Sequence, residues 1–293
     1  MKKKKITGIA SLLSAAFIYG FFGILTRMVG FSLPIFYLAW IRNLFCALLI
    51  LIPLLLSRVW LKVEKKDYHW LILRAIGGIL GFLGSYAAFY YLNISTAYFI
   101  FYTGMLVTSY FFGLVLYKDR LTNIKIVSFV LAIIGLTMIY QLSMDIKSPI
   151  YDLFAFISGF GTSTWNTFSK KISGKYSVLQ LNFLDFFISF VINIVISLAI
   201  REHWVMPSLN RVWLGNLLFV FMFITTGQLM IVGFKYIDTH IGSLIMLSEL
   251  IFGIILSMIF YQEKLTLFAL IGGIIIVIAI ILPEIKYTKD KKN

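Results

Sequence analysis

The chain has 293 residues, of which 60% are hydrophobic and only 13% are charged, and its formal net charge is +14. About 25% of the residues of an ordinary soluble domain are charged, so this composition excludes a cytosolic enzyme, a secreted domain and a disordered chain. The single cysteine, Cys46, excludes a disulfide framework and a cysteine-based zinc site within one chain.

Ten apolar stretches are long enough to cross the hydrocarbon core of a bilayer, which takes about 20 residues of helix. The apolar residues run continuously instead of alternating, which excludes a β-barrel. The sequence therefore predicts an all-α membrane protein with ten transmembrane helices, at approximately residues 7–26, 34–57, 70–92, 95–116, 123–141, 150–168, 178–200, 213–234, 239–261 and 265–283.

The basic residues predict how these spans are oriented. With the N-terminus in the cytoplasm, 19 lysines and arginines fall on the cytoplasmic side, 5 on the other side and 2 within spans. By the positive-inside rule, both termini lie in the cytoplasm of a multi-pass protein of the cell membrane, either inner or plasma. The basic excess then reflects topology, and no nucleic-acid partner is expected. Residues 7–26 lack a cleavage-site pattern, so we expect a retained span and not a signal peptide.

The chain contains an internal repeat. Residues 117–122 resemble residues 261–266 at an offset of 144, and the same offset pairs Ser95-Thr96 with Thr239-His240. Each copy has five spans, which is an odd number, so the second copy enters the membrane upside down. Inverted repeats are typical of secondary transporters. We therefore predict two five-helix halves, at residues 1–145 and 146–293.

Several motifs resemble one transporter family. They are an acidic-basic-Leu-Thr hairpin at Asp119–Thr122 and again at Glu263–Thr266, the small-residue start Ile94–Ala97, and Ser248-Glu249. Together they resemble the EamA-type ten-helix carriers of the drug/metabolite transporter superfamily, over essentially the whole chain. The resemblance implies a carrier for a small polar metabolite, such as an amino acid or a nucleoside-like compound.

Two details refine this resemblance. Arg42 and Leu73-Arg74 are similar to the subgroup that includes S-adenosylmethionine carriers. The family often has proline after the glutamate of the ninth span, where this chain has Leu250, and the equivalent proline is also missing at Met105-Leu106. These departures predict straighter helices in the fourth and ninth spans.

Charged residues at membrane depth are costly, so they are candidate functional groups. Glu249 lies ten residues into its span, which is about 15 Å of helix and reaches the midplane. It could bind a substrate cation, a coupling proton or both, or it could pair with Arg42 or a tyrosine and only hold helices together. Arg42 could bind a substrate carboxylate or neutralise Glu249. Asp185 and Arg74 are shallower, which favours a structural role for both, and Arg74 is close enough to the cytoplasmic surface to snorkel to it.

Uncharged polar and aromatic residues complete the predicted substrate-binding set. Tyr19 and Trp165 are favoured because they occupy weakly matching positions of the two halves. Most tyrosines of a membrane protein are interface anchors, which is the alternative for each of these residues. The set comprises Glu249, Arg42, Tyr19, Trp165, Tyr86, Tyr102, Gln228, Asn166, Asp185 and Arg74.

Other functions remain as alternatives. A lipid-carrier flippase would need a laterally open groove, and a polytopic membrane enzyme would need a nucleophile or a metal set. The three histidines are far apart and no Walker A motif occurs, so we predict no catalytic residue, metal or cofactor. A channel is disfavoured because no span contains a filter-like re-entrant segment.

The expected mechanism is alternating access. Two halves would rock about a midplane cavity lined by the first, third, fourth, sixth, eighth and ninth spans, with hinges such as Asn93–Ser95. The expected partners are a small-molecule substrate, the lipid bilayer, and a coupling proton or an exchanged solute. Gly77, Gly81 and Ser85 should allow close helix packing, and Gly272-Gly273 could serve a repeat contact or a homodimer.

Overall fold

The computed structural model describes residues 2–30, 33–92, 94–118, 122–140, 149–262 and 266–289, and every regular element in these ranges is helical. The elements are α1 (Lys2–Tyr19), α2 (Phe22–Val29), α3 (Ile35–Ser57), the 3₁₀ helix η1 (Lys65–Asp67), α4 (Tyr68–Tyr91), α5 (Ile94–Tyr117), α6 (Asn123–Tyr140), α7 (Pro149–Ile172), α8 (Val178–Ala199), α9 (Arg211–Tyr236), α10 (Thr239–Met246), α11 (Ser248–Tyr261) and α12 (Leu267–Lys289).

The predicted spans coincide with these helices. Eight helical stretches are long and apolar enough to cross a membrane, which confirms a multi-pass all-α protein over the described part of the chain. Helix α7 is long but rich in serine, threonine and asparagine, and the apolar part of α12, Leu267–Pro283, has fewer than 18 residues. Large apolar side chains on the outer faces are more than half exposed, as lipid contact requires; they include Leu55, Leu56, Val115, Val195 and Ile259.

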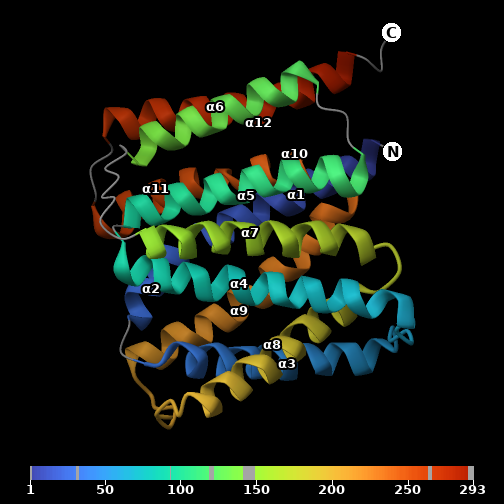
Figure 1. Ribbon diagram of the computed structural model, residues 1–293, viewed down its shortest axis with the longest axis vertical. Coiled ribbons are helices and arrows are strands. Elements are labelled where there is room, and N and C mark those ends of the chain that lie inside the picture. The colour runs from blue at the N-terminus through green and yellow to red at the C-terminus, as the bar shows by residue number, and fades with distance from the viewer. Residues whose placement is uncertain are drawn as a thin grey trace.

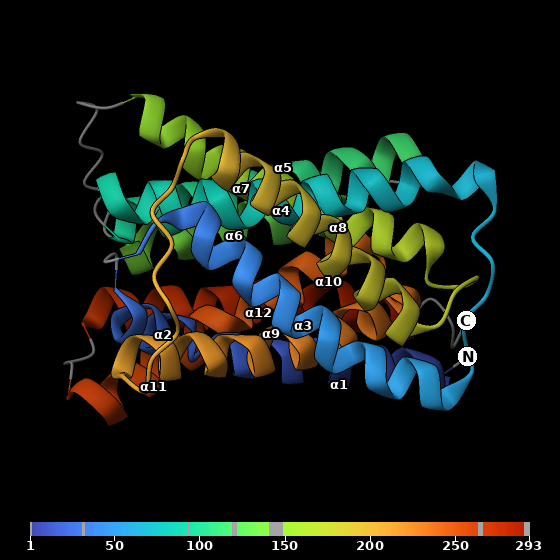
Figure 2. The same cartoon turned by 90° about the horizontal axis from the view of Figure 1, so that it is seen from below.

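The helices form a bundle with distinct edges (Figure 1). Helices α6 and α12 pack together at one edge, and α3 and α8 pack together at the opposite edge, where Figure 2 shows them crossing. Helices α1, α4, α5, α7 and the α10–α11 pair lie between these edges. Helix α1 begins and α12 ends at the same end of the bundle.

Close helix contacts depend on glycine. A Cβ atom on Gly77 of α4 would lie 2.8 Å from the carbonyl oxygen of Gly161 in α7, so no side chain fits between the two backbones. This confirms that the glycines of the third span allow close packing. A Cβ atom on Gly272 of α12 would lie 2.6 Å from the carbonyl oxygen of Gly135 in α6, which places Gly272 at a contact within the chain.

Four helices end in a similar and uncommon way. Among the described residues, the only non-glycine residues with positive φ are Arg58 after α3, Lys118 after α5, Arg201 after α8 and Gln262 after α11. A left-handed residue satisfies the last carbonyl groups of a helix, and it is usually glycine. Arg58 and Arg201 close the second helix of each predicted half, and Lys118 and Gln262 close the fourth helix.

Two spans are interrupted where the sequence predicted none. The first span divides into α1 and α2 at Gly20-Phe21, and the ninth divides into α10 and α11 at Leu247. The fourth span is the continuous helix α5, as predicted, but the prediction of a straighter ninth span was wrong. At this break the Ser248 hydroxyl donates to the carbonyl oxygen of Ile245 at 2.7 Å, and no proline is present.

Candidate functional site

A cavity of about 220 Å³ lies in the middle of the bundle. Its walls come from the predicted first, third, fourth, sixth, eighth and ninth spans, and also from α3 and α8, so the predicted set of lining spans was incomplete. Seven of the ten predicted substrate-binding residues line it: Glu249, Arg42, Tyr19, Trp165, Tyr102, Asn166 and Asp185.

Glu249 lies in the first turn of α11, directly after the break at Leu247. The hydroxyl of Tyr102 faces its carboxylate, although the two groups do not reach normal hydrogen-bonding geometry. Among the residues that the structure describes, no lysine or arginine forms an ion pair with Glu249. Glu249 and Arg42, both described, therefore do not form the ion pair that was the structural alternative for Glu249.

Arg42 is buried on α3 and held by α9. Its Nε donates to the side-chain oxygen of Asn216 at 3.0 Å, and its guanidinium carbon lies 4.5 Å from the ring centre of Phe219. The rings of Phe82 and Phe223 also lie against it, at 5.0 and 5.3 Å. Aromatic faces attract a cation, so these contacts orient the guanidinium while leaving it at the cavity wall.

Arg74 and Asp185 form a buried ionic cluster. Arg74 is 1% exposed, so the prediction that it can snorkel to the cytoplasmic surface was wrong. Its Nε donates to Ser169 at 2.7 Å, and its terminal nitrogen lies 3.6 Å from Asp185. The indole N–H of Trp165 donates to the same carboxylate. The cluster joins α4, α7 and α8, which explains why two shallow charges can stay buried.

Two asparagines carry the clearest binding potential. Asn166 on α7 and Asn182 on α8 are both 0% exposed, and neither the amide oxygen nor the amide nitrogen of either residue has a hydrogen-bond partner among the described residues. Both side chains line the cavity. A buried amide without a partner costs about 1–3 kcal/mol, so this arrangement is favourable only if something else supplies the hydrogen bonds.

The structure does not bring together the whole predicted set. Tyr86 lies beside Arg42 in a small pocket that adjoins the main cavity. Gln228 is half-buried on α9 and is absent from the described cavity lining. Arg74 is not part of the lining either, but it reaches the cavity through Asp185.

The match with known proteins decides the family. The model of the EamA-like transporter family matches residues 6–141 and again residues 149–283. The chain belongs to the EamA-like transporter family. One solved structure, a crystal structure of a protein, is similar with a TM-score of 0.79 and 13% sequence identity over 99% of both chains, which shows a common fold. No curated protein sequence gives a significant match.

The EamA-like resemblance rested partly on segments outside the described residues. Residues 119–121 and 263–265 of the two hairpin motifs fall there, and so does Asn93 of the predicted hinge. The sequence also gave no reason to select Phe82, Phe219 or Phe223, because a phenylalanine facing a cavity cannot be told from one facing lipid. Asn216, a polar residue near the start of its span, was the available signal for a partner of Arg42.

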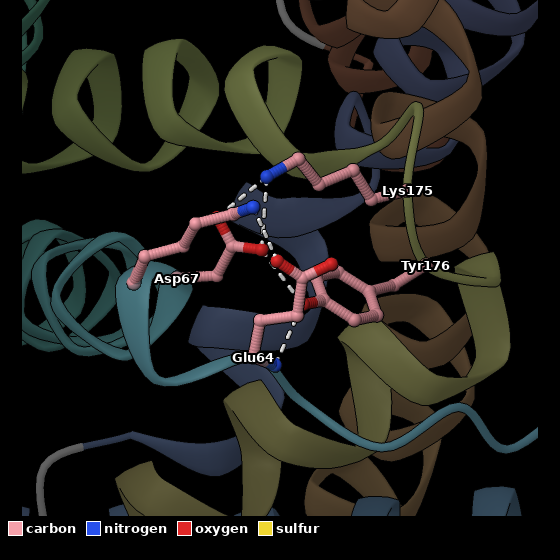
Figure 3. A network of polar contacts seen from close by, with 5 residues as sticks. Glu64, Asp67, Lys175 and Tyr176 are labelled. Atoms are coloured by element: carbon pink, nitrogen blue, oxygen red, sulfur yellow. Dashed lines mark hydrogen bonds and ion pairs between the residues drawn. The ribbon is translucent and has the colours of Figure 1, made fainter.

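A polar network holds together the end of this EamA-like bundle where α1 begins (Figure 3). The Lys175 ammonium donates to both carboxylate oxygens of Asp67, at 2.8 and 3.0 Å, and the Tyr176 hydroxyl donates to Asp67 at 2.8 Å. The Tyr176 hydroxyl also accepts the backbone N–H of Glu64 at 3.1 Å. These bonds tie the α3–α4 connection to the turn between α7 and α8.

A second ionic contact at this end joins α7 to the α9–α10 turn. The Lys170 ammonium lies 2.6 Å from the Asp238 carboxylate. Burial alone would raise the pKa of Asp238, but the Lys170 charge and hydrogen bond outweigh burial and hold it below its ordinary value. The carboxylate therefore stays ionised at neutral pH, and the contact persists there.

Proposed function

We propose that the protein is a secondary transporter of a small polar metabolite, such as an amino acid or a nucleoside-like compound. The observation that carries this proposal is the pair of fully buried asparagines, Asn166 and Asn182, whose amide groups line the central cavity and have no partner in the part of the chain that the structure describes. A solute with hydrogen-bonding groups would satisfy them. Arg42 and Glu249 add one charge of each sign to the same walls.

We further propose that ten spans form two inverted five-helix halves that alternate access to the cavity. The double match of the family model supports this arrangement. So do the paired left-handed ends, since Arg58 corresponds to Arg201 and Lys118 corresponds to Gln262. On this proposal α7 is a spanning helix despite its polar residues, because those residues face the cavity and not lipid.

The proposed orientation places both termini in the cytoplasm of the cell membrane. The excess of lysine and arginine at the end of the bundle where α1 begins supports it. Lys66, Lys170 and Lys175 lie in the polar contacts of that end. The role is transport and not catalysis, and it needs no cofactor.

Ligand screening by thermal shift tests the proposal. A solute that binds the folded protein at 100 times its dissociation constant stabilises it by about 2.7 kcal/mol, so true ligands raise the melting temperature of the purified protein. We expect a hit among small polar metabolites, and we expect the combined Asn166→Ala and Asn182→Ala substitutions to remove the shift. Asn123→Ala, at the exposed start of α6, is the matched control and should keep it.

Transport itself is then measured in proteoliposomes with the radiolabelled hit. The proposal predicts uptake without ATP and accelerated exchange when the hit is also present inside. Binding without any flux would contradict the transporter assignment. Movement of lipid analogues, but of no soluble hit, would favour a flippase instead.

A further inference from the structure

The interruption of the first span lies against α11, the second part of the other interrupted span. A Cβ atom on Gly20, between α1 and α2, would lie 3.0 Å from the Cβ atom of Phe252 and 3.2 Å from the backbone nitrogen of Gly253 in α11. The rings of Phe17 and Phe252 pack edge to face with 5.4 Å between their centres. The break in one span therefore lies against the helix that begins at the other break.

The backbone at the second break is tightly wound. The N–H of Leu247 donates to Leu244 at 3.0 Å and the N–H of Leu250 donates to Leu247 at 3.1 Å, so both bonds span three residues instead of four. Glu249 lies inside this turn. Its carboxyl group thus lies where α10 ends and α11 begins.

Within the described ranges, Glu249 is surrounded by hydroxyl groups and has no counter-ion. Four tyrosines lie around it: Tyr19 of α1, Tyr98 and Tyr102 of α5, and Tyr140 of α6. The rings of Tyr98 and Tyr102 stack with centres 6.0 Å apart, and Tyr98 stacks in the same way on Tyr140.

The other helices near Glu249 contribute one further acidic side chain, and their described residues contribute no basic side chain beside it. Asp185 of α8 lies near Tyr19, and it is already paired with Arg74. Thr226 of α9 is the neighbour of the Tyr19 hydroxyl. The described apolar part of α12, Leu267–Pro283, has no titratable residue, and His240 lies at the opposite end of α10, where its ring contacts Tyr110.

We propose that Glu249 is the proton-binding site of this protein, and that binding and release of its proton control the crossing of the two interrupted spans. An ionised carboxylate without a counter-ion is expensive in a dry interior, so the closed crossing favours the protonated acid. When the contact between α1–α2 and α11 opens, water or a cationic group can enter and favours release of the Glu249 proton. The position of Glu249 in the first turn of α11 also stabilises the carboxylate. The proton moves from the Glu249 carboxyl oxygen to water and back, with no other bond changed.

The proton serves as the coupling ion if the proposed transport function holds; the site itself can be tested without any solute. Infrared difference spectra of the purified protein between acid and alkaline buffer detect a protonated carboxyl group by its carbonyl stretch. We expect such a band to disappear in alkaline buffer and to be missing in Glu249→Gln. Glu64→Gln is the control at an exposed carboxylate outside the cavity and should retain the Glu249 band. An unchanged band in a folded Glu249→Gln protein would overturn the proposal.

Glu249→Asp guards against a Gln variant that does not fold. It keeps a carboxyl group at the break, so the band should persist with a shifted pH midpoint. A wild-type midpoint in Glu249→Asp would mean that the titrating group lies elsewhere, which would contradict the assignment.

Control of the crossing is tested with a single thiol. Because Cys46 is the chain's one cysteine, Cys46→Ser gives a cysteine-free background. Gly253→Cys then places a thiol at the crossing, where the nearest atom to its Cβ, the carbonyl oxygen of Gly20, is at an ordinary 3.8 Å. We expect the labelling rate by a water-soluble thiol reagent to change with pH after correction for thiolate content, and Glu249→Gln to abolish that change. The same pH dependence in Glu249→Gln would overturn the proposed control.

Failure of this proposal is distinguishable from failure of the transport function. A pH-dependent carboxyl band with no flux of any solute would leave the proton site standing and contradict transport. Flux that ignores an imposed pH gradient, and that proceeds at the wild-type rate in Glu249→Gln, would leave transport standing and overturn the proton site.

Discussion

At the scale of single residues, the cavity is organised around polar groups whose hydrogen bonds are incomplete. No described residue is a partner for either amide atom of Asn182, whereas Asn216, on the neighbouring helix α9, accepts a hydrogen bond from Arg42. Both side chains are buried, at 0% and 2% exposure. The same residue type thus plays two different parts: Asn216 stabilises the fold, and Asn182 weakens it in the absence of a ligand.

This difference predicts that replacement by leucine changes the melting temperature in opposite directions at the two positions. Asn182→Leu removes a buried amide without partners, so it should raise the melting temperature of the ligand-free protein, by an amount corresponding to about 1–3 kcal/mol. Asn216→Leu leaves the Arg42 guanidinium without its acceptor and should lower it. Thermal unfolding of the two variants in the same detergent gives the comparison. A lower melting temperature for Asn182→Leu would mean that its amide is satisfied in the native protein.

The buried pair of Arg74 and Asp185 gives a second prediction at this scale. Arg74→Met leaves Asp185 as an uncompensated buried charge, and the expected cost is about 3–5 kcal/mol of stability. Adding Asp185→Leu removes that charge and should recover most of the loss, because a buried ion pair contributes little over apolar packing. Melting curves of the single and double variants measure this. A double variant that is less stable than Arg74→Met would contradict the ion-pair account.

Sequence reasoning identified which residues are unusual at membrane depth, but it could not assign their partners. Position along a span gives depth, and it placed Glu249 and Arg42 correctly within the bundle. It does not tell which neighbouring helix a side chain faces. The sequence therefore allowed Arg74 to snorkel to the surface, although α7 and α8 provide Ser169 and Asp185 to bury it.

At the scale of helices, small residues determine which contacts are rigid. Gly159 of α7 packs directly on the backbone of α5, where an added Cβ would lie 2.6 Å from the nitrogen of Met105 and closer still to the oxygen of Phe101. Gly20 and Gly253, at the crossing of the interrupted spans, are more loosely placed. The α5–α7 contact is thus a pair of continuous helices, whereas the break between α1 and α2 lies against α11, beyond the break at Leu247.

Substitutions of a tightly packed glycine and of an open one test how much the close helix contacts contribute to stability. Gly159→Ala forces a methyl group against backbone atoms that cannot turn away, so we expect a loss of about 1–3 kcal/mol or more. Gly273→Ala is the matched control on α12, since no described atom lies within 4 Å of its Cβ position. It should be neutral or stabilise by about 0.5–1 kcal/mol through lower chain entropy. Equal melting temperatures for the two variants would contradict the observed α5–α7 packing.

The helices themselves were largely predictable, because about 20 apolar residues between breakers leave little alternative in a bilayer. The interruption of the ninth span was not predictable from the missing proline at Leu250. A serine hydroxyl can replace proline as the cause of a bend, but most serines in helices do not bend them. Ser109 makes the same kind of bond, to the carbonyl oxygen of Leu106 at 2.8 Å, inside the continuous helix α5.

At the scale of the whole molecule, the proposed alternating access depends on two halves of opposite orientation around one cavity. The sequence indicated the halves through the similarity of residues 117–122 to 261–266, and the structure adds left-handed ends at Lys118 and Gln262. Both residues follow the fourth helix of their half. If the halves are inverted, these two equivalent positions face opposite sides of the membrane.

Thiol labelling at those two positions tests the central claim most directly. On the Cys46→Ser background, Lys118→Cys and Gln262→Cys are treated with a membrane-impermeant thiol reagent in sealed vesicles of known sidedness. We predict labelling of Lys118→Cys from the cytoplasmic face and of Gln262→Cys from the opposite face. Labelling of both positions from the same face would show that the halves are parallel, and it would contradict the inverted-repeat transporter.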